Sequence, residues 1–207
     1  MPTLQESGLQ FTFTPDWIVK RFDKHRYYKW LSGVGIKGVD FIGIYKGQQL
    51  FLIEVKNYRR RNERQLPEHL IPDSSALGQA FADKILDSLQ VIQTIIGYLK
   101  RRWWYAMAHK IVSQLPSRYR WRWDWYFWSQ AQQLIEQHPD RVRIVLWLEE
   151  AQSVLESSGS IKGELEAVVS TQLNHLSFSR IEVMNIRQNS LEGINCQLAM
   201  PNNYSNS

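Results

Sequence analysis

Three ionisable residues at the ends of two apolar segments have the types and spacing that metal-assisted chemistry needs. Asp40 opens the segment "DFIGIY", and Glu54 and Lys56 close the segment "LFLIEVK" that follows. If both segments are strands, residues two apart point to the same face. Glu54 and Lys56 then project together, and Asp40 lies opposite or diagonal to them. Two carboxylates held this close repel each other unless a cation lies between them.

This combination suits the hydrolysis of a phosphodiester. Hard divalent ions such as Mg²⁺ take oxygen ligands from one or two carboxylates, and waters and substrate phosphate complete the shell. A neighbouring lysine can hold a water or neutralise charge that develops on the phosphate. The alternative is an ordinary ion pair between Glu54 and Lys56 at an exposed strand end, which contributes under about 1 kcal/mol. The residue types alone leave both interpretations open.

The hydrophobic pattern predicts the elements that position these residues. Segments 38–45 and 49–56 are expected to form an antiparallel hairpin, with Gly47 in the turn between them. The later strands are joined through helices, which favours parallel pairing and predicts an α/β fold: a central mixed sheet with helices on both faces. Further strands are expected at 141–150 and 180–186, and helices at 15–30, 74–102 and 161–176.

Residues 103–138 are an aromatic and basic insertion, expected to be helical with a break near Pro116. The alternation in "RYRWRWDWYFW" also fits a strand with two different faces. No acidic residue lies between Ser88 and Trp123, and six of the nine tryptophans fall within the insertion. Clustered tryptophans more often build a core or a dimer interface than stack on bases, so packing or a homodimer contact is the favoured interpretation, with base stacking as the alternative.

Asp40 and the sequence "IEVK" resemble the catalytic motif of the PD-(D/E)XK nuclease superfamily, which has the restriction-endonuclease-like fold, a three-layer α/β/α arrangement. The resemblance implies that Asp40 and Glu54 are metal ligands, with the backbone carbonyl of Val55 as a third. It also implies that Lys56 is the catalytic lysine. Val39 stands where the family usually has proline.

The resemblance also suggests accessory residues. Many relatives add an acidic residue from the first helix, and Asp16 and Asp23 are both candidates. The Gln-x-x-x-Tyr signature of the RecB-like branch is absent, because Asp83 stands four residues after Gln79, so Gln79 is only a candidate accessory residue. The loop after the motif leaves the metal-bearing strand directly and carries four arginines expected to bind DNA: Arg59, Arg60, Arg61 and Arg64.

The resemblance therefore implies a Mg²⁺-dependent DNA endonuclease, a deoxyribonuclease in which Mn²⁺ can substitute. The alternative is a non-catalytic nucleic-acid-binding or assembly module that keeps the nuclease fold. The net charge of +5, from 25 Lys and Arg against 20 Asp and Glu, agrees weakly with a polyanionic partner.

Length and composition favour a single domain over residues 1–207, with a frayed tail from about 199 to 207. The one cysteine, Cys196, cannot form an internal disulfide or a cysteine-based zinc site. The longest apolar runs are far shorter than the roughly 20 residues of a membrane span, and the first residues do not read as a secretory signal. We therefore expect a cytoplasmic protein with no membrane partner.

Overall fold

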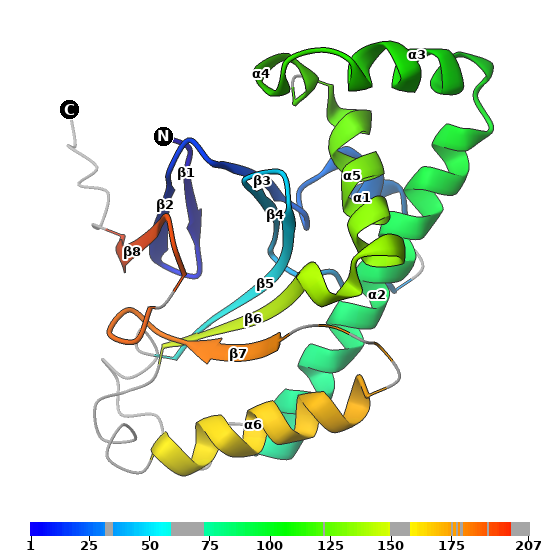
Figure 1. Cartoon of the computed structure of the whole chain (residues 1–207). Coiled ribbons are helices and arrows are strands. Elements are labelled where there is room, and N and C mark those ends of the chain that lie inside the picture. The colour runs from blue at the N-terminus through cyan, green and yellow to red at the C-terminus, as the bar shows by residue number, and fades with distance from the viewer. Residues whose placement is uncertain are drawn as a thin grey trace, which may run out of the picture.

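The computed structural model describes residues 1–31, 35–58, 73–121, 123–149, 158–174, 176, 178, 180–189 and 191–199. These residues form a five-stranded mixed sheet, a three-stranded antiparallel sheet and a set of helices (Figure 1). The predicted α/β class and the mixed central sheet are confirmed. None of the helices in this part of the chain has the length and apolar character needed to cross a membrane.

The five-stranded sheet has the order β3-β4-β5-β6-β7. Strands β4 and β5 form the expected antiparallel hairpin, with Phe41 opposite Ile53 and a left-handed turn at Gly47 (φ 70°). Strands β6 and β7 continue the sheet in parallel with β5, as predicted. The bounds are β3 (Trp17–Arg21), β4 (Phe41–Tyr45), β5 (Gln49–Asn57), β6 (Val142–Glu149) and β7 (Arg180–Met184).

The predicted helix over residues 15–30 is wrong in its first half. Strand β3 pairs with β4, with Trp17 opposite Tyr45, and the helix α1 covers only Arg26–Leu31. The reason is that β3 packs on both faces: Trp17 contacts the hydrophobic cluster on one side of the sheet and Ile18 the cluster on the other. β-Branched and aromatic residues favour such a strand.

Helices cover one face of the central sheet. Helix α2 was predicted almost to its ends, and its buried side includes Leu77, Phe81 and Ile85. The insertion is helical with a break at Pro116, as predicted, so the alternative of a two-faced strand is wrong. The bounds are α2 (Ser74–Lys100), α3 (Trp103–Ser113), α4 (Ser117–Arg120), α5 (Asp124–Gln137) and α6 (Ser158–Gln172), with a 3₁₀ turn at Pro139–Arg141.

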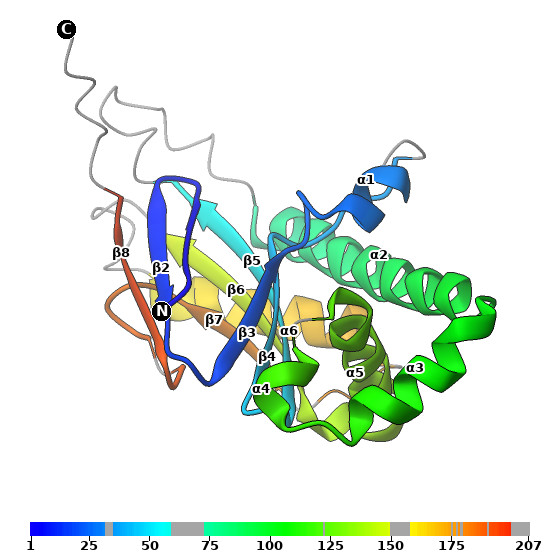
Figure 2. The ribbon, with the colours of Figure 1, turned by 90° about the horizontal axis from the view of Figure 1, so that it is seen from above.

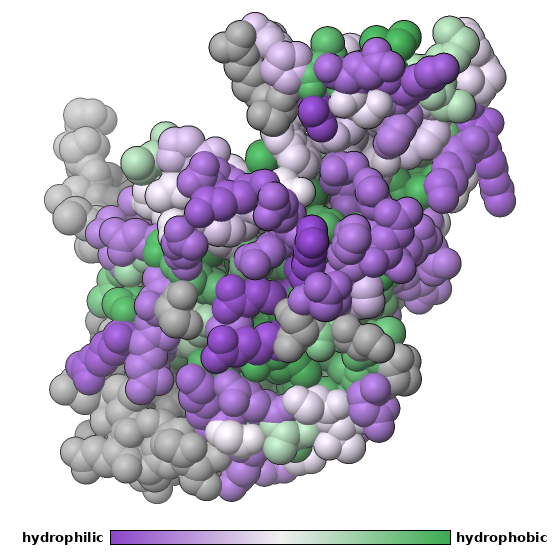
Figure 3. Space-filling model, in the orientation of Figure 1, coloured by the Kyte–Doolittle hydropathy of each residue, from purple (hydrophilic) through white to green (hydrophobic). Residues whose placement is uncertain are grey.

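The tryptophans of the insertion divide between core and surface. Trp125 and Trp128 are buried, which confirms the favoured packing interpretation for these two. Helices α3 and α4 form an arm beyond the central sheet, and hydrophobic residues lie along the outer edge of this arm (Figure 3). The exposed large hydrophobic residues of α3 are Trp103, Met107 and Ile111. The predicted homodimer contact through this segment stays a prediction.

A second sheet covers the other face of the central sheet, so the predicted helical layer on this side is wrong (Figure 2). Phe11 packs edge-on against Phe41 and Trp147, with ring centroids 5.4 and 5.1 Å apart. Apolar residues at every second position make β2 one-sided, which is the pattern of a strand that covers a sheet. The strands are β1 (Thr3–Glu6), β2 (Leu9–Phe13) and β8 (Ile194–Leu198), in the order β1-β2-β8.

Candidate functional site

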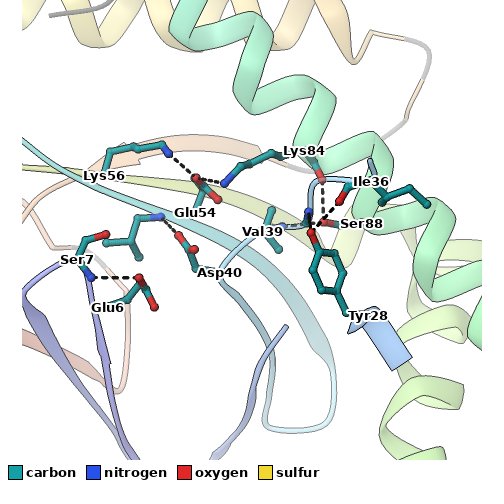
Figure 4. A network of polar contacts seen from close by, with 12 residues as sticks. Glu6, Ser7, Tyr28, Ile36, Val39, Asp40, Glu54, Lys56, Lys84 and Ser88 are labelled. Atoms are coloured by element: carbon teal, nitrogen blue, oxygen red, sulfur yellow. Dashed lines mark hydrogen bonds and ion pairs between the residues drawn. The ribbon is translucent and has the colours of Figure 1, made fainter. Parts of the chain in front are cut away.

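The hairpin holds Asp40 against β5. Asp40 immediately precedes β4, and its carboxylate oxygen Oδ2 accepts a hydrogen bond of 2.7 Å from the backbone N–H of Val55. The residue before it is fixed by α2, because the N–H of Val39 donates to Oγ of Ser88 at 3.0 Å. From the other side, Tyr28 of α1 accepts a hydrogen bond of 2.9 Å from the N–H of Gly38 (Figure 4). Two helices and a strand therefore determine where Asp40 lies.

Glu54 lies on the helix-facing side of β5 and is almost fully buried (1% exposed). Leu50 and Leu52 share this side, which explains why Glu54 points toward α2. Its Oε1 accepts contacts from two lysines, Lys56 at 3.0 Å and Lys84 of α2 at 2.5 Å (Figure 4). Its Oε2 is buried without a hydrogen-bond partner among the described residues.

Two further carboxylates gather around Asp40. Glu6 from β1 and Asp23, two residues after β3, each place a carboxylate oxygen within 4.8 Å of one another and of Asp40. Glu6 also pairs with Arg21 at 2.6 Å. Oδ1 of Asp23 is buried and has no hydrogen-bond partner in the part of the chain that the structure describes. The three acids thus form a negatively charged cluster beside Glu54.

The electrostatics of this cluster oppose ionisation. Burial, together with the charge of Glu54, raises the pKa of Asp40 to about 7, although the N–H of Val55 and the charge of Lys84 act in the other direction. Burial and then the charge of Glu6 raise the pKa of Asp23. Crowded carboxylates with raised pKa values are stabilised by a cation, which favours their charged form.

The structure brings together the three central residues of the predicted site, Asp40, Glu54 and Lys56. Val55 joins them through its N–H, and the metal-binding role of its carbonyl stays a prediction. Between the two candidate acids, Asp23 lies in the cluster. Asp16 is exposed at the opposite end of β3, where its carbonyl accepts a hydrogen bond from the N–H of Lys46.

One predicted accessory residue does not take part in this arrangement. Gln79 is exposed on α2 and donates a hydrogen bond of 2.8 Å to Asp83, so the structure places it outside the cluster. The four arginines predicted to bind DNA lie outside the described residues: Arg59, Arg60, Arg61 and Arg64.

Sequence reasoning missed two members of the site, Lys84 and Glu6. The signal for Lys84 is its place in α2: it lies three residues after Phe81 and seven after Leu77, on the buried side of the helix. A lysine at such a position requires a buried partner, and Glu54 is that partner. Glu6 carries no comparable signal, because it reaches the cluster only through the packing of the second sheet.

No family model, curated protein or solved structure matches this chain. The chemistry of the site therefore follows from the atoms that it brings together. The donors are carboxylate oxygens, which hard divalent cations prefer, and two of those oxygens, on Asp23 and Glu54, are buried without partners in the described chain. The residues present thus fit a Mg²⁺ or Mn²⁺ ion.

Proposed function

We propose that this chain is a metal-dependent endonuclease that hydrolyses phosphodiester bonds in DNA and has a restriction-endonuclease-like core. The observation that carries the proposal is the meeting of Asp40, Glu54 and Lys56 on adjacent antiparallel strands. This is the arrangement that the PD-(D/E)XK resemblance implies. The mixed sheet in which β6 and β7 run parallel to β5 supports it further.

Asp40 is the central ligand for Mg²⁺ in this proposal, with Asp23, Glu6 and Glu54 around it. When bound, the ion supplies positive charge that stabilises the phosphate and lowers the pKa of a water. Mn²⁺ takes the same oxygen ligands and is expected to substitute.

The chain's own residues orient these groups and supply a positive charge. The N–H of Val55 fixes one oxygen of Asp40, and Lys84 fixes one oxygen of Glu54. Lys56 lies on the same face as Glu54 but remains one-third exposed, so its ammonium group can reach a substrate that approaches the strand end. There it holds a water or stabilises negative charge on the phosphate.

A second candidate function is a non-catalytic nucleic-acid-binding or assembly module. One observation favours it: Glu54 already contacts both lysines, so the ion pairs are closed within the chain. In that case Lys56 and Lys84 stabilise the fold and DNA binds elsewhere. The two functions predict different results when Lys56 is lost. An endonuclease stops cutting DNA but still binds it, whereas a binding module has no cleavage to lose.

The deciding experiment incubates supercoiled plasmid and branched DNA with the protein and Mg²⁺ or Mn²⁺. We expect nicking or linearisation that EDTA stops and that Lys56→Met removes. Lys46→Met is the matched control, because Lys46 lies in the turn at the other end of the β4–β5 hairpin and pairs with Glu192. An absence of cleavage on every DNA form, with no metal binding by calorimetry, would overturn the proposal.

A further inference from the structure

Aromatic rings and guanidinium groups follow one another over α1 and the C-terminal end of α2. The rings of Trp30 and Tyr98 lie 6.4 Å apart between centroids and join the two helices. At one end Arg26 lies 4.9 Å over the ring of Tyr27, which is 6.0 Å from Trp30. At the other end Arg102 lies 4.7 Å over Tyr98. We call this group the aromatic track: Arg26, Tyr27, Trp30, Tyr98, Arg102 and the adjoining Trp103.

Three rings of the track are exposed, whereas its Tyr27 is buried. Trp30 is 69% exposed, Trp103 82% and Tyr98 41%, whereas Trp128 of the neighbouring helix α5 is fully buried. Side chains of this size contribute to stability when they are buried. The exposure of these three rings, on α1, α2 and α3, indicates a surface that contacts another molecule.

The charge around the track indicates which class of molecule it binds. Lys100 and Arg101 are exposed beside Arg102, and the sequence has no acidic residue between Ser88 and Trp123; at the other end of the track Arg26 pairs with Asp124 at 3.4 Å. A second copy of the chain would place like charges against each other on this surface. A nucleic-acid strand supplies phosphates for the basic groups and flat base faces for the rings.

The position of the track connects it to the candidate site. Arg26 stands three residues after Asp23, and three residues of chain span at most about 11 Å. In the same helix, Tyr28 accepts from the N–H of Gly38 and donates to the carbonyl of Ile36, just before Asp40. Helix α1 lies alongside α2 (Figure 2), so the track begins beside the acidic cluster and leads away from it.

We propose that the aromatic track binds unpaired bases of a DNA strand that extends from the candidate catalytic cluster. This inference rests on the proposed function, because it takes DNA as the substrate. In a duplex the faces of the bases are covered by their neighbours, so rings can stack only on bases that have left the duplex. The track thus selects DNA with a single-stranded segment next to the bond that is cut.

The test measures binding of fluorescein-labelled oligothymidine by anisotropy, with the full chain and EDTA so that no cleavage occurs. Trp30→Ala and Tyr98→Ala are each expected to weaken binding on the order of 10-fold, the loss typical for one stacked base. Trp123→Ala is the matched control, because Trp123 is 51% exposed and lies outside the track. We expect it to bind within about twofold of the wild-type protein, since it removes a ring of equal size without touching the track.

Unchanged affinity in Trp30→Ala and Tyr98→Ala would overturn the inference, as would binding to oligouridine but not to oligothymidine. Tighter binding to a blunt duplex than to oligothymidine would overturn it as well.

Cleavage of plasmid DNA, measured separately, distinguishes the two proposals. If the track variants lose oligothymidine binding but the wild-type protein cuts no DNA, the endonuclease proposal fails and the binding surface stands. If the wild-type protein cuts DNA and the variants bind normally, the track fails alone.

Discussion

Two partly buried aspartates, Asp40 and Asp124, lie in opposite electrostatic surroundings. Asp124 is the first residue of α5, and three basic side chains, from β3, α1 and the residue before α1, surround its carboxylate: Lys20 at 2.9 Å, His25 at 3.0 Å and Arg26 at 3.4 Å. Asp40 instead accepts one backbone N–H and lies among further carboxylates. Basic side chains outnumber acidic ones around Asp124, whereas the carboxylate oxygens of Asp40, Asp23 and Glu6 lie within 4.8 Å of one another.

The pKa values of the two aspartates differ accordingly. Burial acts to raise the pKa of Asp124, but hydrogen bonds from His25 and Lys20, together with their charges, hold it well below its usual range. Burial and the charge of Glu54 raise the pKa of Asp40 to about 7. The chain itself supplies the positive charge where a carboxylate joins α5 to β3 and α1, and it crowds carboxylates together at the candidate site. Their mutual repulsion is what a divalent cation would relieve.

The largest expected effect is a difference in DNA cleavage between Asp40→Asn and Asp124→Asn. Asp40→Asn removes a proposed metal ligand and should abolish metal-dependent cleavage, whereas Asp124→Asn should cut DNA at nearly the wild-type rate when folded. The measurement is plasmid nicking with Mg²⁺ by both variants, after circular dichroism confirms that each is folded. Cleavage by Asp40→Asn at more than a few per cent of the wild-type rate would move the catalytic centre elsewhere.

Lys56→Met gives the next largest effect. If Lys56 holds the attacking water or stabilises the phosphate, its loss should slow single-turnover cleavage on the order of 10²- to 10³-fold while metal and DNA still bind. The assay uses Mn²⁺ and saturating protein, beside an anisotropy measurement on the same preparation. Lys46→Met should retain the wild-type rate. Near-normal cleavage by Lys56→Met would mean that its contact with Glu54 is only structural.

The sequence predicted the parts of the site that lie close together along the chain. The hairpin of β4 and β5 follows from two apolar segments around Gly47, and it brings Asp40 to Glu54 by local pairing alone. Helix α2 could also be predicted from the sequence, because its apolar residues recur over 27 residues.

The missed parts depend on contacts between distant segments. The sequence predicts a helix where strand β3 lies, because a short segment that is apolar on both sides satisfies either period. The second sheet joins β2 to β8, whose residues Phe11 and Cys196 are partners far apart in the sequence. Glu6 enters the site only through that sheet, so no local pattern could have identified it.

A smaller effect concerns stability. Asp124→Asn removes the negative charge that three basic side chains share, and we expect it to lower the free energy of unfolding by about 1–3 kcal/mol at neutral pH. Asp40→Asn should leave the metal-free protein as stable as the wild type or stabilise it, because it relieves repulsion with Glu54. Urea denaturation with EDTA measures both. Equal losses in the two variants would contradict the contrast between the aspartates.

The last effect is a dependence of stability on pH that belongs to Asp40. Because the pKa of this group is raised to about 7 in the folded protein, the folded state binds its proton more tightly than the unfolded state does. The resulting contribution to stability is fully present below the ordinary pKa of 3.8 and is lost as the pH rises through about 7. Asp124 contributes in the opposite sense: its stabilisation is lost only as the pH falls below the ordinary carboxyl range, so it does not mask this trend.

Urea denaturation of the metal-free protein at about pH 5 and about pH 8 isolates the contribution of Asp40. The wild-type protein should lose more stability between these two values than Asp40→Asn, because asparagine cannot titrate. Added Mg²⁺ should reverse the loss at the higher pH, since it binds the ionised cluster of the folded state. The same pH dependence in both proteins would mean that Asp40 titrates normally and that burial and the charge of Glu54 do not raise its pKa.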